Sequence, residues 1–188
     1  LALTAAPAAA QEHVWIEGES LPQPPAGFAA GGWGRPDTLS GGKWLHAAVE
    51  PADVAKTVPA DGVRLAYQFA VTDAGPREVW GRIGFEFARA PFRWRIDSGE
   101  WAEVKPDDYT TDLMALADFA EVAWRKLGTA DLTAGKHTLE IDIPRPARQV
   151  NGKPEPQRLL FGLDAVCLSR EAFRPNGPHQ PGADWQTA

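Results

Sequence analysis

The chain has 188 residues, a length that suits one domain with a sizeable hydrophobic core. Its formal net charge of −6, with no basic stripe, argues against nucleic acid as a partner. The single cysteine excludes an internal disulfide, and no apolar run is long enough for a transmembrane helix.

The first ten residues, LALTAAPAAA, are typical of the end of a secretory signal peptide, with small residues just before Gln11. We therefore interpret residues 1–10 as a signal-peptide remnant and exclude them from the fold; a low-complexity linker is the alternative. An exported protein with one cysteine is expected in the bacterial periplasm or outside the cell.

The stretch VWIEGES, residues 14–20, predicts the first strand. Glu17 and Glu19 stand two positions apart, so in a strand they point to the same side. Two neighbouring carboxylates repel each other. The repulsion must be offset by solvent, by an arginine, by a catalytic proton or by a metal ion.

A Pro/Gly-rich stretch over residues 21–42 predicts a loop. Alternating apolar residues then predict strands at 43–49, 63–71, 77–88, 92–97, 122–132, 133–143 and 159–169. Between them, Thr111 can cap a short helix through Ala120, which predicts a helical insertion near 110–120. Residues 171–188 are again Pro/Gly-rich and are expected to form a linker to another domain.

Strands joined by turns, without the regular helices of a parallel sheet, predict an all-β fold over residues 13–170. The expected architecture is an antiparallel β-sandwich of the jelly-roll type, in which the first and last strands are neighbours. Tryptophans that alternate with apolar residues are expected in the core: Trp44, Trp94 and Trp124.

Several pieces occur in a characteristic order: the E-x-E pair, then SGGKWL, YQFAVTDAGPREVWGRI, IDSG, LTAGKHTLEI and LDAVCLS. This order resembles the galactose-binding-like β-sandwich of family 6 and family 35 carbohydrate-binding modules, from about Val14 to Ser169. The resemblance implies a structural calcium ion bound by Glu17, Glu19 and Asp164, with backbone carbonyls near residues 40–42 completing the oxygen shell. Alternatively, the two glutamates line a solvated strand face and Asp164 caps a turn.

The resemblance also implies a sugar site in the loops at one end of the sandwich, where aromatic rings stack on sugars and charged groups bind hydroxyls. The candidate residues are Trp33, Arg35, Asp37, Trp101, Asp107, Asp108 and Tyr109. Trp33 leads them because the glycines around it are hard to explain by core packing, although packing over the core stays an alternative. A second candidate surface carries Trp80, Arg82, Arg93 and Arg95, if their two strands pair; the alternative there is a solvated face.

Catalysis has little support, because no GxSxG, HExxH or P-loop motif occurs. The leading hypothesis is a non-catalytic carbohydrate-binding module that directs a secreted enzyme to its polysaccharide. Its partners would be a polysaccharide or oligosaccharide and the catalytic domain of a parent enzyme, with no nucleic acid and no membrane. One alternative is a structural β-sandwich that packs against a catalytic partner without binding sugar. The other is a small jelly-roll polysaccharide lyase or glycoside hydrolase.

Overall fold

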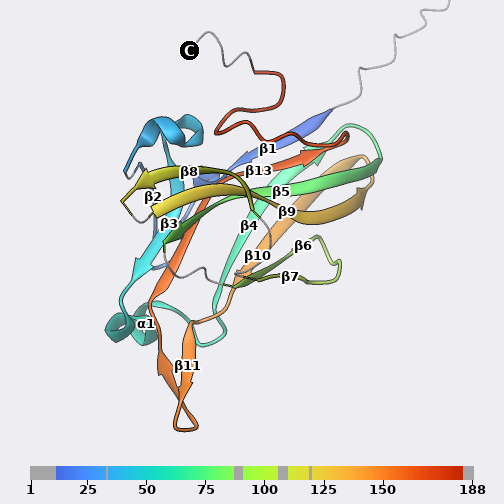
Figure 1. The fold of residues 1–188 in the computed structure, drawn as a ribbon. Helices are drawn as coiled ribbons and strands as arrows, with labels where there is room; N and C mark the ends of the chain where they lie inside the picture. Colours follow the sequence, from blue (N-terminus) through green and yellow to red (C-terminus); the bar gives the residue numbers. More distant parts are fainter. Residues whose placement is uncertain (1–11, 33, 87–90, 106–109, 119, 184–188) are drawn as a thin grey trace, which may run out of the picture.

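The computed structural model describes residues 12–183 except 33, 87–90, 106–109 and 119, and two antiparallel sheets form its body (Figure 1). The seven-stranded sheet contains β1 (His13–Glu17), β2 (Phe28–Gly31), β3 (Trp44–Val49), β5 (Gly75–Glu86), β8 (Thr111–Ala117), β9 (Ala120–Leu132) and β13 (Leu159–Ser169). The four-stranded sheet has the order β4 (Val63–Val71), β10 (Gly135–Ile143), β6 (Phe92–Ile96) and β7 (Ala102–Val104). The predicted all-β sandwich is confirmed.

Short elements lie between the strands of the two sheets. They are the α-helix α1 (Pro51–Thr57), the hairpin of β11 (Ala147–Val150) and β12 (Lys153–Pro156), and the 3-10 turns η1 (Gly18–Ser20), η2 (Pro36–Thr38) and η3 (Ser40–Gly42). None of the helices in the described part of the chain is long and apolar enough to cross a membrane.

The core lies between the two sheets and follows the alternation seen in the sequence. Along β4, every second side chain from Val63 to Val71 is buried and the others are exposed. The last strand, β13, is the centre of the larger sheet: one edge pairs with β5, and the other pairs with β3 and then with β1. The predicted contact between first and last strands is therefore present, with Glu17 opposite Ala165.

The outer face of the seven-stranded sheet is largely covered by other parts of the chain. Residues 34–42 lie over its middle, and residues 170–183 return across the tryptophans on β5 and β9. The predicted core positions of Trp44, Trp94 and Trp124 are confirmed, although Trp44 and Trp124 lie under these covering segments.

The helix predicted near residues 110–120 is wrong: Thr111–Ala117 is strand β8, which pairs with the edge of β9. Its pairing register shifts twice, and Asp112 has a positive φ of 55°. These irregularities disturb the period-two pattern of a strand. Leu116 is consequently buried, whereas Leu113 is exposed to solvent. Their three-residue spacing resembles one face of a helix, and this spacing produced the wrong prediction.

The first part of the segment expected to be a linker, up to Gly177, is packed against the sheet. Phe173 is buried beside Trp124, with ring centroids 4.8 Å apart, and the Trp124 indole N–H donates to the Gly177 carbonyl at 2.9 Å. The Phe173 amide also donates to Glu78 at 3.1 Å. Residues up to Gly177 are thus part of the folded unit, and only their composition resembles a linker.

Candidate functional site

The loop of residues 34–42, hereafter the anchored loop, is fixed to the sheet by backbone contacts. The Arg35 amide donates to the Leu116 carbonyl at 2.7 Å. Gly34 has a φ of 69°, and a Cβ added there would lie 2.2 Å from the Leu116 oxygen. Only glycine tolerates both conditions. These contacts therefore fix the anchored loop in a single placement over β8.

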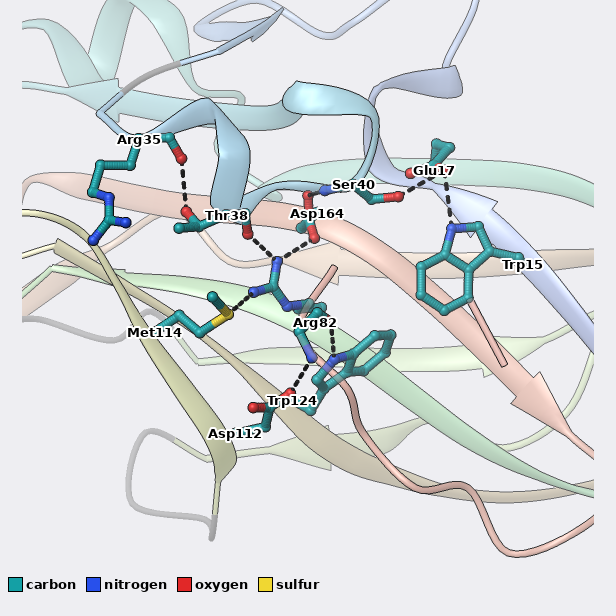
Figure 2. A network of polar contacts seen from close by, with 11 residues as sticks. Trp15, Glu17, Arg35, Thr38, Ser40, Arg82, Asp112, Met114, Trp124 and Asp164 are labelled. Carbon is teal, nitrogen blue, oxygen red and sulfur yellow. Dashed lines mark hydrogen bonds and ion pairs between the residues drawn. The ribbon is translucent and has the colours of Figure 1, made fainter. Parts of the chain in front are cut away.

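A buried ion pair lies beneath the anchored loop (Figure 2). The Arg82 guanidinium donates to the Asp164 carboxylate at 2.6 Å, and both side chains are completely buried. The same guanidinium nitrogen donates to the Thr38 carbonyl at 2.7 Å, and a second nitrogen lies 3.2 Å from the Met114 sulfur. Arg82 thus joins β5, β13, the anchored loop and β8. Charges removed from water need such partners, because their loss of hydration is large.

Asp164 also holds the anchored loop directly. Its second oxygen accepts a hydrogen bond from the Ser40 amide at 2.9 Å. Burial raises the pKa of Asp164 to about 6, and the neighbouring Arg82 opposes that shift. Each carboxylate oxygen already has one donor. Asp164 therefore offers a metal ion only its remaining lone pairs.

The two glutamates lie beside this network, but the predicted strand that would carry both is wrong beyond Glu17: Glu17 ends β1, and Glu19 lies in the 3-10 turn η1. One Glu17 oxygen accepts from the Trp15 indole at 3.0 Å and from the Ser40 hydroxyl at 2.9 Å. The other Glu17 oxygen, and one oxygen of Glu19, are buried with no hydrogen-bond partner among the described residues. Burial raises the pKa of Glu19, and the charge of Glu17 adds to that rise. A cation bound to these oxygens would offset both effects.

The fit to calcium is therefore partial. Two buried oxygens without partners are the type of ligand that calcium takes. However, no group of three or more His, Cys, Asp or Glu side chains in the described residues is arranged to hold a metal ion. The third expected ligand, Asp164, is bound to Arg82 instead.

The expected sugar ligands are not all in one place. Arg35 and Asp37 project from the anchored loop as an exposed pair 3.5 Å apart. Trp33, Asp107, Asp108 and Tyr109 lie outside the described residues. Trp101 precedes β7 on the other sheet. Arg93 and Arg95 point away from the core there, because they alternate along β6 with Phe92 and Trp94, which point inward. The structure therefore separates Trp101 from Arg35 and Asp37.

The second candidate surface of Trp80, Arg82, Arg93 and Arg95, which required their two strands to pair, does not form. Their strands do not pair: β5 lies between β13 and β9, whereas β6 lies between β10 and β7. Arg82 is buried in the ion pair, and Trp80 packs against Phe173 of the covering segment. The two remaining arginines instead approach Trp101.

The buried pair of Arg82 and Asp164 was missed from the sequence. Arg82 occupies an outward position on its strand, where an arginine is normally solvated. One signal was available: Asp164 is the single charge in the otherwise apolar strand LLFGLDAVCLS, so it required a buried cationic partner.

Comparison with known proteins gives similarity in structure only. No protein-family model and no curated protein matches the chain. One similar solved structure is the Podospora anserina GH26-CBM35 β-(1,4)-mannanase, with a TM-score of 0.55 and 15% identity over 92% of this chain and 32% of that chain. Another is the exo-β-1,3-galactanase of Phanerochaete chrysosporium with galactose, with a TM-score of 0.46 and 12% identity over 84% and 29% of the two chains.

These structures are carbohydrate-active enzymes, and the chain spans about a third of the length of either. At 15% identity the likeness to the mannanase establishes a shared fold. The chain thus shares a β-sandwich fold with part of that mannanase.

Proposed function

We propose that this domain is a non-catalytic carbohydrate-binding module of the family 6 or family 35 type, attached to a secreted enzyme that degrades polysaccharides. The observation that carries the proposal is the anchored loop. Its backbone is tied to β8, β5 and β13, while the side chains of Arg35 and Asp37, which follow Trp33 closely in the sequence, remain exposed. Carbohydrate sites are usually preformed in this way, because ordering a loop on binding would reduce affinity.

The burial and ion pairing of the acidic residues favour sugar binding over catalysis. Glycoside hydrolysis needs two carboxyl groups that flank an open cleft. Asp164 is completely buried and paired with Arg82, and Glu17 and Glu19 are half-buried beneath the loop. Asp37 is exposed, and its ion-pair partner among the described residues is Arg35 at 3.5 Å. Such groups are suited to holding structure and to hydrogen-bonding hydroxyls.

Replacing Trp33 with alanine is expected to abolish retention in affinity electrophoresis on the polysaccharide that the domain binds. The reason is that stacking of a sugar on an indole supplies much of the affinity of such sites. The melting temperature should stay nearly unchanged. Arg35→Ala should weaken binding about tenfold, because a hydrogen bond to a charged group is lost.

The matched control is Arg148→Ala, which removes an exposed arginine paired with Glu155 on the β11–β12 hairpin. This variant should bind like the wild type. Unaltered retention of the Trp33 variant would remove the anchored loop as the binding site. The absence of retention on every polysaccharide of a broad panel would favour the structural, non-binding alternative.

We further propose that a structural calcium ion is bound by Glu17 and Glu19, with Asp164 at the border of the site. The support is the pair of buried oxygens without partners and the raised pKa of Glu19. When bound, the ion would neutralise the two glutamates and tie η1 to the end of β1. The chain's own residues provide the second tie, through Ser40, which contacts both Glu17 and Asp164.

Removal of calcium with a chelator is expected to lower the melting temperature by roughly 5–10 °C, since an ion present at 100 times its Kd stabilises the native state by about 2.7 kcal/mol. The double variant Glu17→Gln, Glu19→Gln should show no response to the chelator. Glu155→Gln, on the exposed hairpin, is the control and should respond like the wild type. The calcium proposal fails if elemental analysis finds no metal and the chelator has no effect.

A further inference from the structure

A histidine lies in the core-facing row of β10, near the start of that strand. Leu139, Ile141 and Ile143 of this row point into the core, and His137 continues the row to the rim of the sandwich. Its side chain is only 6% exposed, and its ring lies 5.5 Å from that of Phe69 on the neighbouring strand β4. A titratable side chain is thus buried where the strand pattern favours an apolar one.

Both nitrogens of the His137 ring face acceptors. Nδ1 lies 2.7 Å from a carboxylate oxygen of Asp97, and Nε2 lies 2.8 Å from the carbonyl oxygen of Thr133. Neither a carbonyl nor an ionised carboxylate can donate a hydrogen bond. A neutral imidazole has a single N–H, so one of the two contacts would become a repulsion between lone pairs. Only the doubly protonated imidazolium donates to both partners.

Asp97 is held as the carboxylate that this arrangement needs. Its other oxygen accepts from the Thr138 amide at 2.8 Å, and the Asp97 amide donates to the Thr138 carbonyl at 2.8 Å. Burial alone would raise the pKa of Asp97, but the hydrogen bonds from His137 and from the Thr138 amide lower it. Asp97 also has a φ of 52°, a conformation that costs energy and persists only when its neighbours support it.

Through these contacts His137 joins two turns. Asp97 begins the turn of residues 97–101, which leads from β6 to β7, the edge strand of the four-stranded sheet. Thr133 lies in the turn between β9 of the larger sheet and β10 of the smaller one. The protons on one imidazole therefore hold the 97–101 turn against the connection between the two sheets.

The other charged groups near the ring are not paired with it. A hollow of about 400 Å³ adjoins the ring, and three further charged side chains line it: Arg95, Glu100 and Asp131. On β10 itself Lys136 is exposed, and β4 contributes the uncharged Phe69. Within the part of the chain that the structure describes, Asp97 is the ion-pair partner of the ring.

We infer that His137 is a proton-operated clamp: its imidazolium ties the 97–101 turn to the β9–β10 turn, and loss of one proton to solvent releases the 97–101 turn and loosens the edge strand β7. The inference does not depend on the proposed carbohydrate-binding function.

The pH range of the clamp follows from its two groups. The hydrogen bond with Asp97 raises the pKa of His137 above its ordinary value of 6.5, although burial acts in the opposite direction. The stabilisation is therefore complete below about pH 6.5 and is lost as the pH rises through the raised pKa. The lowered pKa of Asp97 makes its contribution complete above 3.8, and this contribution is lost only as the pH falls through the lowered value. The clamp is closed between these limits.

The direct test is an NMR titration, between about pH 5 and pH 9, of the full chain with isotope-labelled histidine nitrogens. The His137 signals are assigned by their loss in His137→Gln or, if that variant does not fold, by their shift in Asp97→Asn. Both ring nitrogens should be protonated at about pH 6, and the midpoint should lie above 6.5 and above that of His46, whose pKa burial lowers. An unprotonated ring nitrogen at that pH, or a midpoint at or below 6.5, overturns the inference.

Urea denaturation over the same pH range tests whether the proton stabilises the fold. The difference between wild type and His137→Gln should shrink as the pH rises and become constant once the ring is neutral, because only lost packing then remains. His46→Gln is the matched control and should change in the other direction, since the pKa of His46 is lowered. A His137 difference that is the same at every pH would make this residue a structural side chain only and would reject the clamp.

Amide hydrogen exchange locates the release. After correction for the intrinsic rise of exchange with pH, the amides of Asp97 and Gly99, which donate to Thr138 and Ile96, should exchange faster above the His137 midpoint. Amides in β13, at the centre of the larger sheet, should not. Unchanged exchange in the 97–101 turn overturns its release.

Discussion

Arg82→Met is expected to lower the free energy of unfolding by about 3–5 kcal/mol, because it leaves the buried carboxylate of Asp164 without its cation. The loss should also free the Thr38 carbonyl, which accepts from the same guanidinium nitrogen. Urea denaturation measures the change. Because the anchored loop loses one of its ties, retention on polysaccharide should decline as well.

The matched control is Arg148→Met, at an exposed ion pair with an N–O distance of 3.5 Å, which should change stability by no more than about 0.5 kcal/mol. The double variant Arg82→Met, Asp164→Asn should be more stable than Arg82→Met alone, since the unpaired charge is gone while the hydrogen bond from the Ser40 amide can persist. A double variant less stable than the single one would mean that the guanidinium acts by filling space rather than by neutralising Asp164.

Phe173→Ala is expected to destabilise the domain by about 3 kcal/mol, near the lower end of the range for loss of a buried phenylalanine. The expected loss is at the lower end because the covering segment can detach without unfolding the sheets. Its departure would expose Trp124, which is otherwise completely buried. The measurement is thermal unfolding combined with limited proteolysis, in which cleavage between residues 170 and 183 should become much faster.

Arg174→Ala is the control for this prediction. Arg174 is the exposed neighbour of Phe173, and its replacement should leave both the melting temperature and the protease pattern as in the wild type. If Phe173→Ala behaves in the same way, the segment contributes nothing to the domain and is a linker, as its composition indicated.

The strands that could be predicted from the sequence are those whose alternation of buried and exposed residues is visible, as in β4 and β10. In β4 and β10, buried residues alternate because each strand has one face toward the core, and this periodicity is visible in the sequence. In β8 the register shifts hide the same periodicity. The covering role of residues 170–183 was also invisible, because a Pro/Gly-rich segment that packs through one phenylalanine has the same composition as one that does not pack.

The candidate site, too, could be predicted only where it depends on the order of the strands along the chain. The sequence predicts that the first and last strands are neighbours, and this pairing brings Glu17 and Glu19 near Asp164. Which face of which sheet carries Trp101 depends instead on how strands pair across the sandwich. The pairing of β6 with β10, and not with β5, determines which face carries Trp101. No local sequence pattern predicts this pairing.

The central position of β13 has a consequence for how the chain acquires its fold. This strand pairs with β5 along one edge and with β3 and β1 along the other. Three strands from the first half of the chain therefore lack their pairing partner until residues 159–169 are present. Contacts that span most of a chain form slowly, because a large loop must close before any pairing energy is gained. During synthesis the larger sheet therefore stays incomplete until its last strand is made. The apolar strands that precede it remain open to mispairing in the meantime, and a chaperone would protect them.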